Sequence, residues 1–239
     1  MAEEEKTATK VPWTSEVNAG KLESFTAEMG NDVPSKGTFA EDYAGFVEST
    51  GLVVGCPFFS STEIGVRIAN VAIDLPSWRA MLLAISTAGS PVKELACYGC
   101  TLESQHISDL VATLEKMGVM EVVKMDFLTV KLGDEEDLTN TLLPLLSSEK
   151  TMINYLSLKG CNLSDSFASS DGLYKNLSEN VALTTLNLAN NQFTDMGLSS
   201  ICKALKVSPA ITEVSLAQNN AEGDCLMDLV GMLAGVEVS

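Results

Sequence analysis

The chain has 239 residues, enough for one sizeable domain or for a modest repeat array with an extension. Its formal net charge is −17, from 32 acidic and 15 basic residues, which argues against nucleic acid or an anionic membrane as partner, because both need a basic surface. The acidic N-terminus and the absence of a long apolar run predict no secretion signal, no transit peptide and no membrane insertion. We therefore expect a cytoplasmic protein, with the cytoskeleton as one place of action, and cysteines that stay reduced.

The N-terminal part of the chain divides into two segments. Residues 1–35 are polar and rich in Glu, Thr, Ser, Gly and Asn, which is typical of an arm that is mostly extended or disordered when free. Residues 36–62 contain a helical stretch at 38–50 and then an apolar stretch from Leu52 to Phe59. This second segment is apolar enough to cover the core of a first repeat, so we interpret it as an N-terminal cap.

An internal repeat occupies the rest of the chain. Residues 183–193 read LTTLNLANNQF, with apolar residues at positions 1, 4, 6 and 11 and asparagine at position 9. The same spacing returns clearly from Ile153, Ile211 and Val92, and in degenerate form from Met120 and Glu63. Six units therefore start near residues 63, 92, 120, 153, 183 and 211.

The segments between the predicted strands have the spacing of amphipathic helices, so each unit is expected to run strand, turn, helix and return loop. Pro76, Ser164-Asp165 and Thr194-Asp195 are suitable helix starts. The acidic loop 133–137 is interpreted as a further helix start, with a cation or partner contact as the alternative. Apolar Val71 and Leu128 stand where a polar turn residue is expected, which predicts local distortion in those two turns.

These motifs, above all INYLSLKGCNL and LTTLNLANNQFTDMGLSSICKAL, resemble leucine-rich repeats of the ribonuclease-inhibitor type over residues 63–239. The resemblance implies an α/β fold, a right-handed leucine-rich-repeat solenoid or horseshoe segment with a parallel sheet on the concave face and helices on the convex face. It also implies that Asn191 and Asn219 hydrogen-bond to backbone groups of adjacent turns, and that Cys100 and Cys161 do so more weakly. The class includes inhibitors, scaffolds, actin regulators and GTPase activators, so it indicates a fold and not a partner.

Two features of the sequence could carry chemistry. Cys97 and Cys100 form a CxxC pair, but the repeat places Cys97 in the core and Cys100 in the turn, and no second pair completes a metal site. His106 is the single histidine and is expected on the exposed start of a helix. Phosphate-loop, dinucleotide, hydrolase and metalloprotease motifs are absent. We therefore expect no catalytic residues, no cofactor and no metal site.

The concave face is the predicted binding surface, because strand side chains between the core leucines point to it. Its middle repeats combine aromatic area with basic side chains, a mixture enriched at binding hot spots. The alternatives are a face that is merely solvated, as the small residues along it suggest, or a site on the convex face or the edges. The predicted partner-binding residues are Tyr98, Val122, Lys124, Asp126, Tyr155 and Lys159.

The last predicted helix, near residues 226–233, is followed by few residues, so the terminal repeat is expected to expose an apolar edge. Three alternatives follow: a partner covers this edge, the array makes end-to-end contact with another copy, or the natural protein is longer. We predict a non-enzymatic interaction scaffold or structural subunit that binds other proteins in a larger assembly, such as a cytoskeletal or ciliary one. The alternative is an actin-filament regulator, because LTTLNLANNQFTD also resembles tropomodulin. A small-GTPase activator of the same repeat class is the third hypothesis.

Overall fold

The computed structural model describes residues 35–50, 59–62, 64–87, 89–117, 120–126, 129–131, 152–169, 171–225 and 231. The predictions made for the N-terminal arm, for Leu128, for the acidic loop 133–137 and for most of the last helix lie outside these residues.

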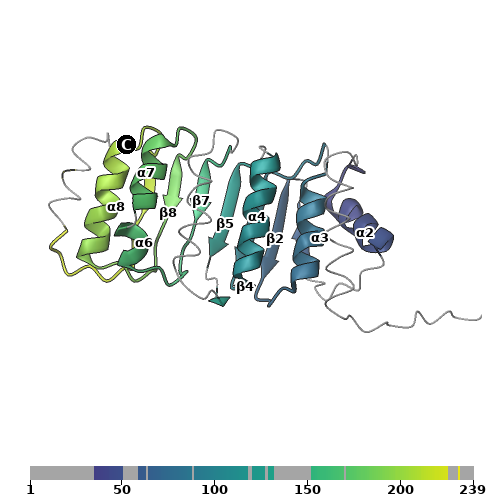
Figure 1. Ribbon diagram of the computed structural model, residues 1–239, viewed down its shortest axis with the longest axis horizontal. Helices are drawn as coiled ribbons and strands as arrows, with labels where there is room; N and C mark the ends of the chain where they lie inside the picture. Colours follow the sequence, from purple (N-terminus) through teal and green to yellow (C-terminus); the bar gives the residue numbers. More distant parts are fainter. Residues whose placement is uncertain are drawn as a thin grey trace, which may run out of the picture.

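One sheet of seven strands runs through the described chain, in the order β1-β2-β3-β5-β7-β8-β9 (Figure 1). The strands from β2 onward are parallel, and β1 pairs with β2 in the antiparallel sense. A second, two-stranded parallel sheet joins β4 to β6. The strands are β1 Phe59–Ser61, β2 Gly65–Ala69, β3 Glu94–Tyr98, β4 Thr101–Glu103, β5 Val122–Asp126, β6 Thr129–Lys131, β7 Tyr155–Ser157, β8 Thr185–Asn187 and β9 Glu213–Ser215.

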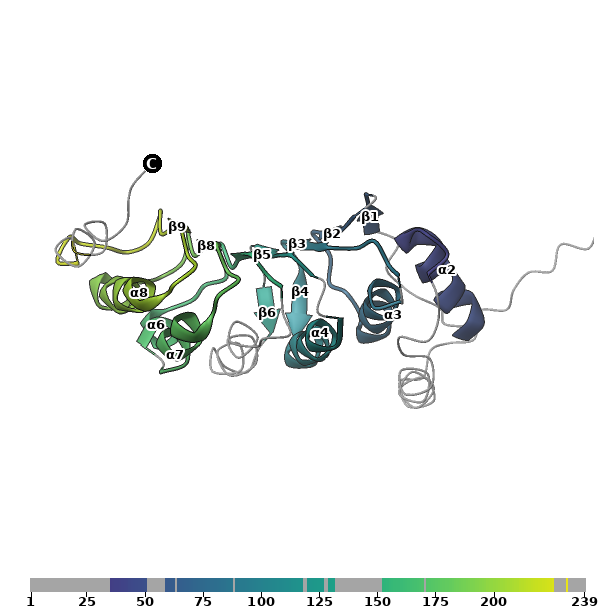
Figure 2. The ribbon, with the colours of Figure 1, turned by 90° about the horizontal axis from the view of Figure 1, so that it is seen from above.

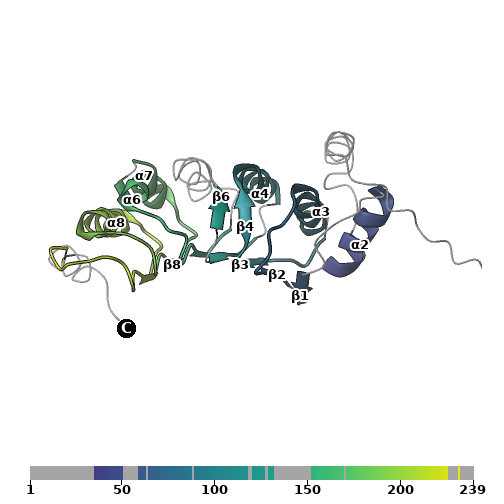
Figure 3. The same ribbon diagram turned by 90° about the horizontal axis from the view of Figure 1, so that it is seen from below.

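Helices alternate with the strands and cover one face of the large sheet. Figures 2 and 3 show α3, α4, α6, α7 and α8 side by side on that face, with α2 beside α3 at one end. Among the described residues no helix covers the opposite face, which we call the open face. The helices are α2 Phe39–Thr50, α3 Leu75–Ile85, α4 Ser104–Met117, α6 Asp165–Ser169, α7 Asp171–Glu179 and α8 Asp195–Val207.

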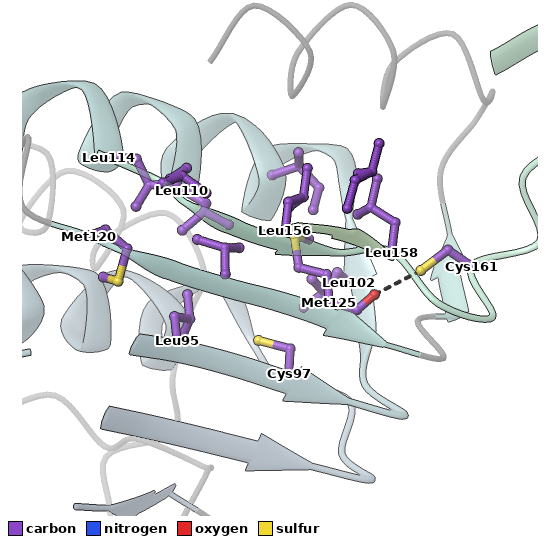
Figure 4. Close-up of a cluster of buried hydrophobic side chains, with 14 of the residues drawn as sticks. Leu95, Cys97, Leu102, Leu110, Leu114, Met120, Met125, Leu156, Leu158 and Cys161 are labelled. Atoms are coloured by element: carbon purple, nitrogen blue, oxygen red, sulfur yellow. Dashed lines mark hydrogen bonds between the residues drawn. The ribbon is translucent and has the colours of Figure 1, made fainter. Parts of the chain in front are cut away.

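A single hydrophobic core lies between the sheet and the helices. Leu95, Val123, Leu156, Leu186 and Val214 are successive Cα partners along one row of the sheet, and each is buried in this core or packed against it. The next inward row contains the expected leucines at 158, 188 and 216, so the prediction that the aliphatic rows share one interior is confirmed. Figure 4 shows its middle, where side chains from β3, β5 and α4 meet.

In five of the six units, those whose turn the structure describes, the chain leaves the strand through a residue with left-handed backbone conformation. The φ angles are 54° at Asn70, 60° at Gly99, 67° at Gly160, 56° at Asn190 and 58° at Gln218. Glycine adopts this conformation at no steric cost and asparagine at little, whereas a β-branched residue is strained there. At Gly99 an added Cβ would also lie 2.6 Å from Oδ1 of Asn70, because consecutive turns stack closely.

Asparagine side chains connect the stacked turns through hydrogen bonds to buried backbone groups. Oδ1 of Asn191 accepts a hydrogen bond from the Leu163 amide at 3.0 Å, and its Nδ2 donates to the Leu158 carbonyl at 3.0 Å. Asn219 repeats the pattern one unit later, accepting from the Phe193 amide at 3.2 Å and donating to a carbonyl of the preceding unit at 3.1 Å. The role that the family resemblance implied for these two asparagines is confirmed.

Cysteine replaces asparagine in the earlier turns and keeps part of this role. Sγ of Cys161 donates to the Met125 carbonyl of the preceding unit at 2.8 Å (Figure 4). Sγ of Cys100 lies 3.5 Å from the Tyr98 carbonyl of its own turn. A thiol is a weaker donor than an amide and offers one hydrogen, so these turns are held less firmly than those with asparagine.

The helix starts add contacts between units. Pro76 lies in the first turn of α3, as predicted. Thr194 is the N-cap of α8, and its backbone amide donates to Oδ1 of Asp165 in the preceding unit at 2.8 Å. Asp195 in turn accepts hydrogen bonds from the amides of Glu222, Gly223 and Cys225 in the following unit. Hydrogen bonds from the Cys225 side chain and from these amides lower the pKa of Asp195 well below its usual value.

His106 is buried, with 2% of its surface exposed, so the prediction of a surface position is wrong. Its Nδ1 accepts a hydrogen bond from the Glu103 amide at 3.1 Å, and its Nε2 lies 3.0 Å from the Ile73 carbonyl of the preceding unit. The indole N–H of Trp78 donates to the His106 carbonyl at 2.8 Å. These hydrogen bonds satisfy both ring nitrogens inside the core. The spacing of apolar residues in the sequence does not reveal that a histidine is buried in this way. The ring is neutral with hydrogen on Nε2, because Nδ1 must stay an acceptor.

The cost of losing an asparagine turn can be measured at position 191. Asn191→Leu leaves the Leu163 amide and neighbouring carbonyls without their partner, and we expect it to lower the free energy of unfolding by about 2–4 kcal/mol in urea denaturation. Asn191→Cys is the matched control, because it reproduces the donor that Cys161 supplies, and its loss should be roughly half as large. Equal losses for the two variants would contradict the hydrogen-bond explanation.

Protonation of His106 should weaken the fold. Burial lowers its pKa in the native state below the ordinary value of 6.5, so the unfolded chain binds the proton more readily and the native state loses stability as the pH falls through about 6.5. Urea denaturation at pH 7.5 and 5.5 should therefore show a larger pH-dependent loss in the wild type than in His106→Gln, which does not titrate. The same carboxylates titrate in both proteins, so identical pH slopes would refute this assignment.

Candidate functional site

The open face is formed by alternate strand residues that lie between the core rows. In β5, for example, Val123 and Met125 are buried while Val122, Lys124 and Asp126 are half-buried. The Cα partners give the register of this face. One row is Glu94, Val122, Tyr155, Thr185 and Glu213, the next is Arg67, Ala96, Lys124, Ser157, Asn187 and Ser215, and a third contains Tyr98 and Asp126.

Lys124 occupies the middle of this face between two diagonal neighbours. Its Nζ lies 2.9 Å from Oε1 of Glu94 on β3 and 5.2 Å from the ring centre of Tyr155 on β7. Diagonal neighbours on adjacent strands are within reach of long side chains, which explains both contacts. A half-exposed ion pair and a cation–π contact are each worth about 1 kcal/mol or less, so their main effect is to hold the ammonium group in one place.

The remaining predicted residues lie at the end of the same face where the strands turn. Oγ of Ser157 donates a hydrogen bond to Oδ1 of Asp126, again along a diagonal, and Ser157 is fully buried beneath its neighbours. Tyr98 is the register partner of Asp126 and has 48% of its surface exposed. Lys159 follows β7 by two residues and is half-buried. The structure thus brings the six predicted residues onto one continuous surface.

The charge of this surface differs from that of the whole chain. Within the described register rows and the Lys159 turn, the charged residues are three basic and three acidic, whereas the chain carries a net charge of −17. Because basic and acidic groups are both present at fixed positions, this surface can pair with charged groups of either sign on a partner without repelling the partner as a whole. The basic members are Arg67, Lys124 and Lys159, and the acidic members are Glu94, Asp126 and Glu213.

Two members of the site were not predicted. Neither Glu94 nor Ser157 is among the predicted partner-binding residues. Ser157 is the direct register partner of Lys124, and Glu94 is that of Val122, but direct register does not show that the Ser157 hydroxyl reaches Asp126 or that the Glu94 carboxylate reaches Lys124. Diagonal pairing across adjacent strands would have identified both.

The CxxC pair lies inside the core and not on this surface. Cys97 and Cys100 are buried, with 1% and 0% of their surfaces exposed. A hydrogen bond from the Cys97 thiol lowers the pKa of Cys100 to about 7, and the same interaction together with burial raises the pKa of Cys97. The five cysteines in the described ranges are free thiols, and no group of three or more potential metal ligands occurs in those ranges. Without access to solvent, the pair serves the packing of the turn.

Comparison with known proteins gives one family match. The family model described as Leucine Rich Repeat matches residues 182–204, which include β8 and most of α8. A comparison with curated proteins finds no match. No helix in the described part of the chain is both long enough and apolar enough to cross a membrane.

Two solved structures show weak similarity. The structure titled "Leiomodin-1 Actin-Binding Site 2 (ABS2)" is 17% identical with a TM-score of 0.31, and the alignment covers 56% of this chain and 58% of that one. An internalin (inlF) from Listeria monocytogenes str. 4b F2365 is 14% identical with a TM-score of 0.39, with 72% of this chain and 46% of that one covered. The chain spans about half the length of each structure. Both likenesses are too weak to carry an argument.

The assignment therefore depends on the family match and on the geometry that surrounds it. The matched segment contains the left-handed residue Asn190 and the turn asparagine Asn191, and both features recur in other units at the same positions. The strand, turn and helix of the matched segment are likewise repeated along the parallel sheet. Residues 182–204 therefore form a leucine-rich repeat, and the other described units repeat its geometry.

Proposed function

We propose that the protein is a non-enzymatic binding module, a scaffold or structural subunit, that docks a partner protein on its open face. The site is the surface formed by Tyr98, Val122, Lys124, Asp126, Tyr155 and Lys159. The observation that carries the proposal is the fixed position of Lys124 between Glu94 and the Tyr155 ring, on strands held in register by the sheet.

This arrangement has the properties of an energetic hot spot. Tyrosine gives a large contact area and loses little conformational entropy on binding, and Tyr98 has about half of its surface available for contact. Side chains already ordered by diagonal contacts cost less to immobilise when a partner docks. The partner would meet aromatic area in the middle of the face with charged groups around it.

The groups that could carry reactions have structural roles instead. His106 is enclosed and hydrogen-bonded at both ring nitrogens, and Cys97 and Cys100 are enclosed in the core. We therefore propose no catalytic residue, cofactor or metal site for the described chain.

The proposal includes a finer architecture. We infer a right-handed solenoid of the ribonuclease-inhibitor type, in which α2 and β1 cover the N-terminal end of the repeats. Phe39 and Phe46 of α2 reach the common core, which supports this role for α2. A cytoplasmic assembly, cytoskeletal or ciliary, and end-to-end contact through the terminal repeat belong to the same hypothesis.

Paired tyrosine variants test the location of the site. Tyr98 on the open face and Tyr174 on α7 are exposed to nearly the same extent, 48% and 49%. Tyr98→Ser should reduce recovery of the main co-purified protein at least tenfold, which corresponds to about 1.4 kcal/mol of binding free energy, whereas Tyr174→Ser should leave it unchanged. The measurement is quantitative mass spectrometry after affinity purification of the full chain. If Tyr174→Ser reduced recovery and Tyr98→Ser did not, the binding site would lie on the helical face.

The actin-regulator hypothesis has its own assay. A chain that caps filaments should slow pyrene-actin elongation at pointed ends in proportion to its concentration. An unchanged elongation rate removes this alternative and leaves the general binding proposal standing.

A further inference from the structure

A hollow lies on the open face next to β1 and adjoins the site described above at Glu94. It is lined by residues of β1, β2 and β3 and of the turn between β1 and β2, including Ser61, Thr62, Arg67, Glu94 and Ala96. In Figures 2 and 3 β1 rises from the sheet on the side away from the helices, so it borders the open face at this end. The hollow is therefore bordered on one side by β1 and is continuous with the open face on the other.

Small residues create the space at the floor of the hollow. Ala96 on β3 is the register partner of Arg67 on β2, and Gly65, which has no side chain, lies two residues before Arg67. An added Cβ at Gly65 would lie 3.0 Å from Oγ1 of Thr62, so even a methyl group would crowd this end. Ser61 and Thr62 line the same space. The Thr62 hydroxyl donates to the Gly65 carbonyl at 3.5 Å, and the Ser61 hydroxyl can donate a hydrogen bond to an acceptor in the hollow.

Arg67 gives the hollow its charge. Its side chain is exposed, and it makes no ion pair or hydrogen bond with any other residue that the structure describes. The other arginine in the described chain, Arg79, is paired with Asp109 at 2.6 Å. A guanidinium group presents several N–H donors in a planar fork that matches the two oxygens of a carboxylate.

The acidic residue that lines the hollow does not cancel this charge. Glu94 is paired with Lys124 at 2.9 Å, so Arg67, Glu94 and Lys124 together carry a formal charge of +1. A singly charged anion complements this sum. A phosphate group carries more negative charge at neutral pH and would be opposed by the Glu94 carboxylate at the same wall.

We propose that the hollow binds a side-chain carboxylate, from an aspartate or glutamate of the protein docked on the open face. The inference deepens the proposed function and rests on it, because Glu94 belongs both to the hollow and to the Lys124 contact. The carboxylate accepts two hydrogen bonds from the Arg67 fork and one from the Ser61 hydroxyl. A partner is thereby fixed in register, with its acidic residue toward β1 and its apolar contact toward Tyr98 and Tyr155.

A small probe tests the hollow without the partner. The ¹⁵N-labelled full chain is titrated with N-acetyl-glutamate N-methylamide, with the corresponding glutamine derivative, and with inorganic phosphate, while amide and arginine Nε–H signals are followed by NMR. The glutamate probe should give saturable shifts at Gly65, Arg67 and Ala96. The glutamine derivative should bind with at least tenfold lower affinity. Arg67→Gln should abolish these shifts, and Arg67→Lys should weaken them.

Lys206→Gln provides the matched control, because it removes one positive charge from an exposed position on α8 and should leave the titration unchanged. Absence of saturable shifts, equal binding of the glutamine derivative, or tighter binding of phosphate would each overturn the proposal.

Arg67→Gln should also lower recovery of the co-purified protein. If Tyr98→Ser abolishes recovery and Arg67→Gln does not change it, the carboxylate site is refuted and the docking function stands. If Tyr98→Ser has no effect, the docking function fails, and the NMR titration alone decides whether the hollow binds a carboxylate.

Discussion

Each repeat depends on its neighbours for the partners of its buried polar groups. Asn191 hydrogen-bonds to backbone atoms of both Leu158 and Leu163 in the preceding unit, and Asp195 accepts amide hydrogens from the following one. A single unit would leave these groups unsatisfied and would expose one apolar face to water. Stacking removes both penalties at once, which is why the core strand of each unit joins the seven-stranded sheet and the buried side chains form a single core.

The same stacking determines the chemistry of the open face. Since the rungs of the sheet are in register, the position of a residue within its unit also fixes which residues lie beside it and diagonally across from it. Lys124 reaches Glu94 on one side and Tyr155 on the other by this rule, and Asp126 reaches Ser157. The binding surface is therefore assembled from three units, none of which contains it alone.

Periodicity explains which features could be predicted from the sequence. The core rows, the strand positions and the turn position of Asn191 and Asn219 recur at the same place within successive units, so several copies support each assignment. His106 occurs once, and its burial depends on the Glu103 amide and the Ile73 carbonyl, which no apolar pattern reports. The six predicted residues of the site are on one surface. The contact of Glu94 with Lys124 and the hollow at Arg67 could not be predicted from the strand register alone, because the first depends on the conformation of two long side chains and the second on the position of β1.

The left-handed residues that follow the strands restrict where such a chain can gain or lose residues. Inserting one residue between Leu186 and Leu188 would move Ala189 into the left-handed place and Asn190 into the place of Asn191, while Leu188 would turn from the core to the open face. Deleting one residue would be equally disruptive. The predicted unit starts are unequally spaced, by 29, 28, 33, 30 and 28 residues, so the differences in length lie outside the strand and the turn. The length of the connecting segments can change while the strand and turn keep a constant residue count.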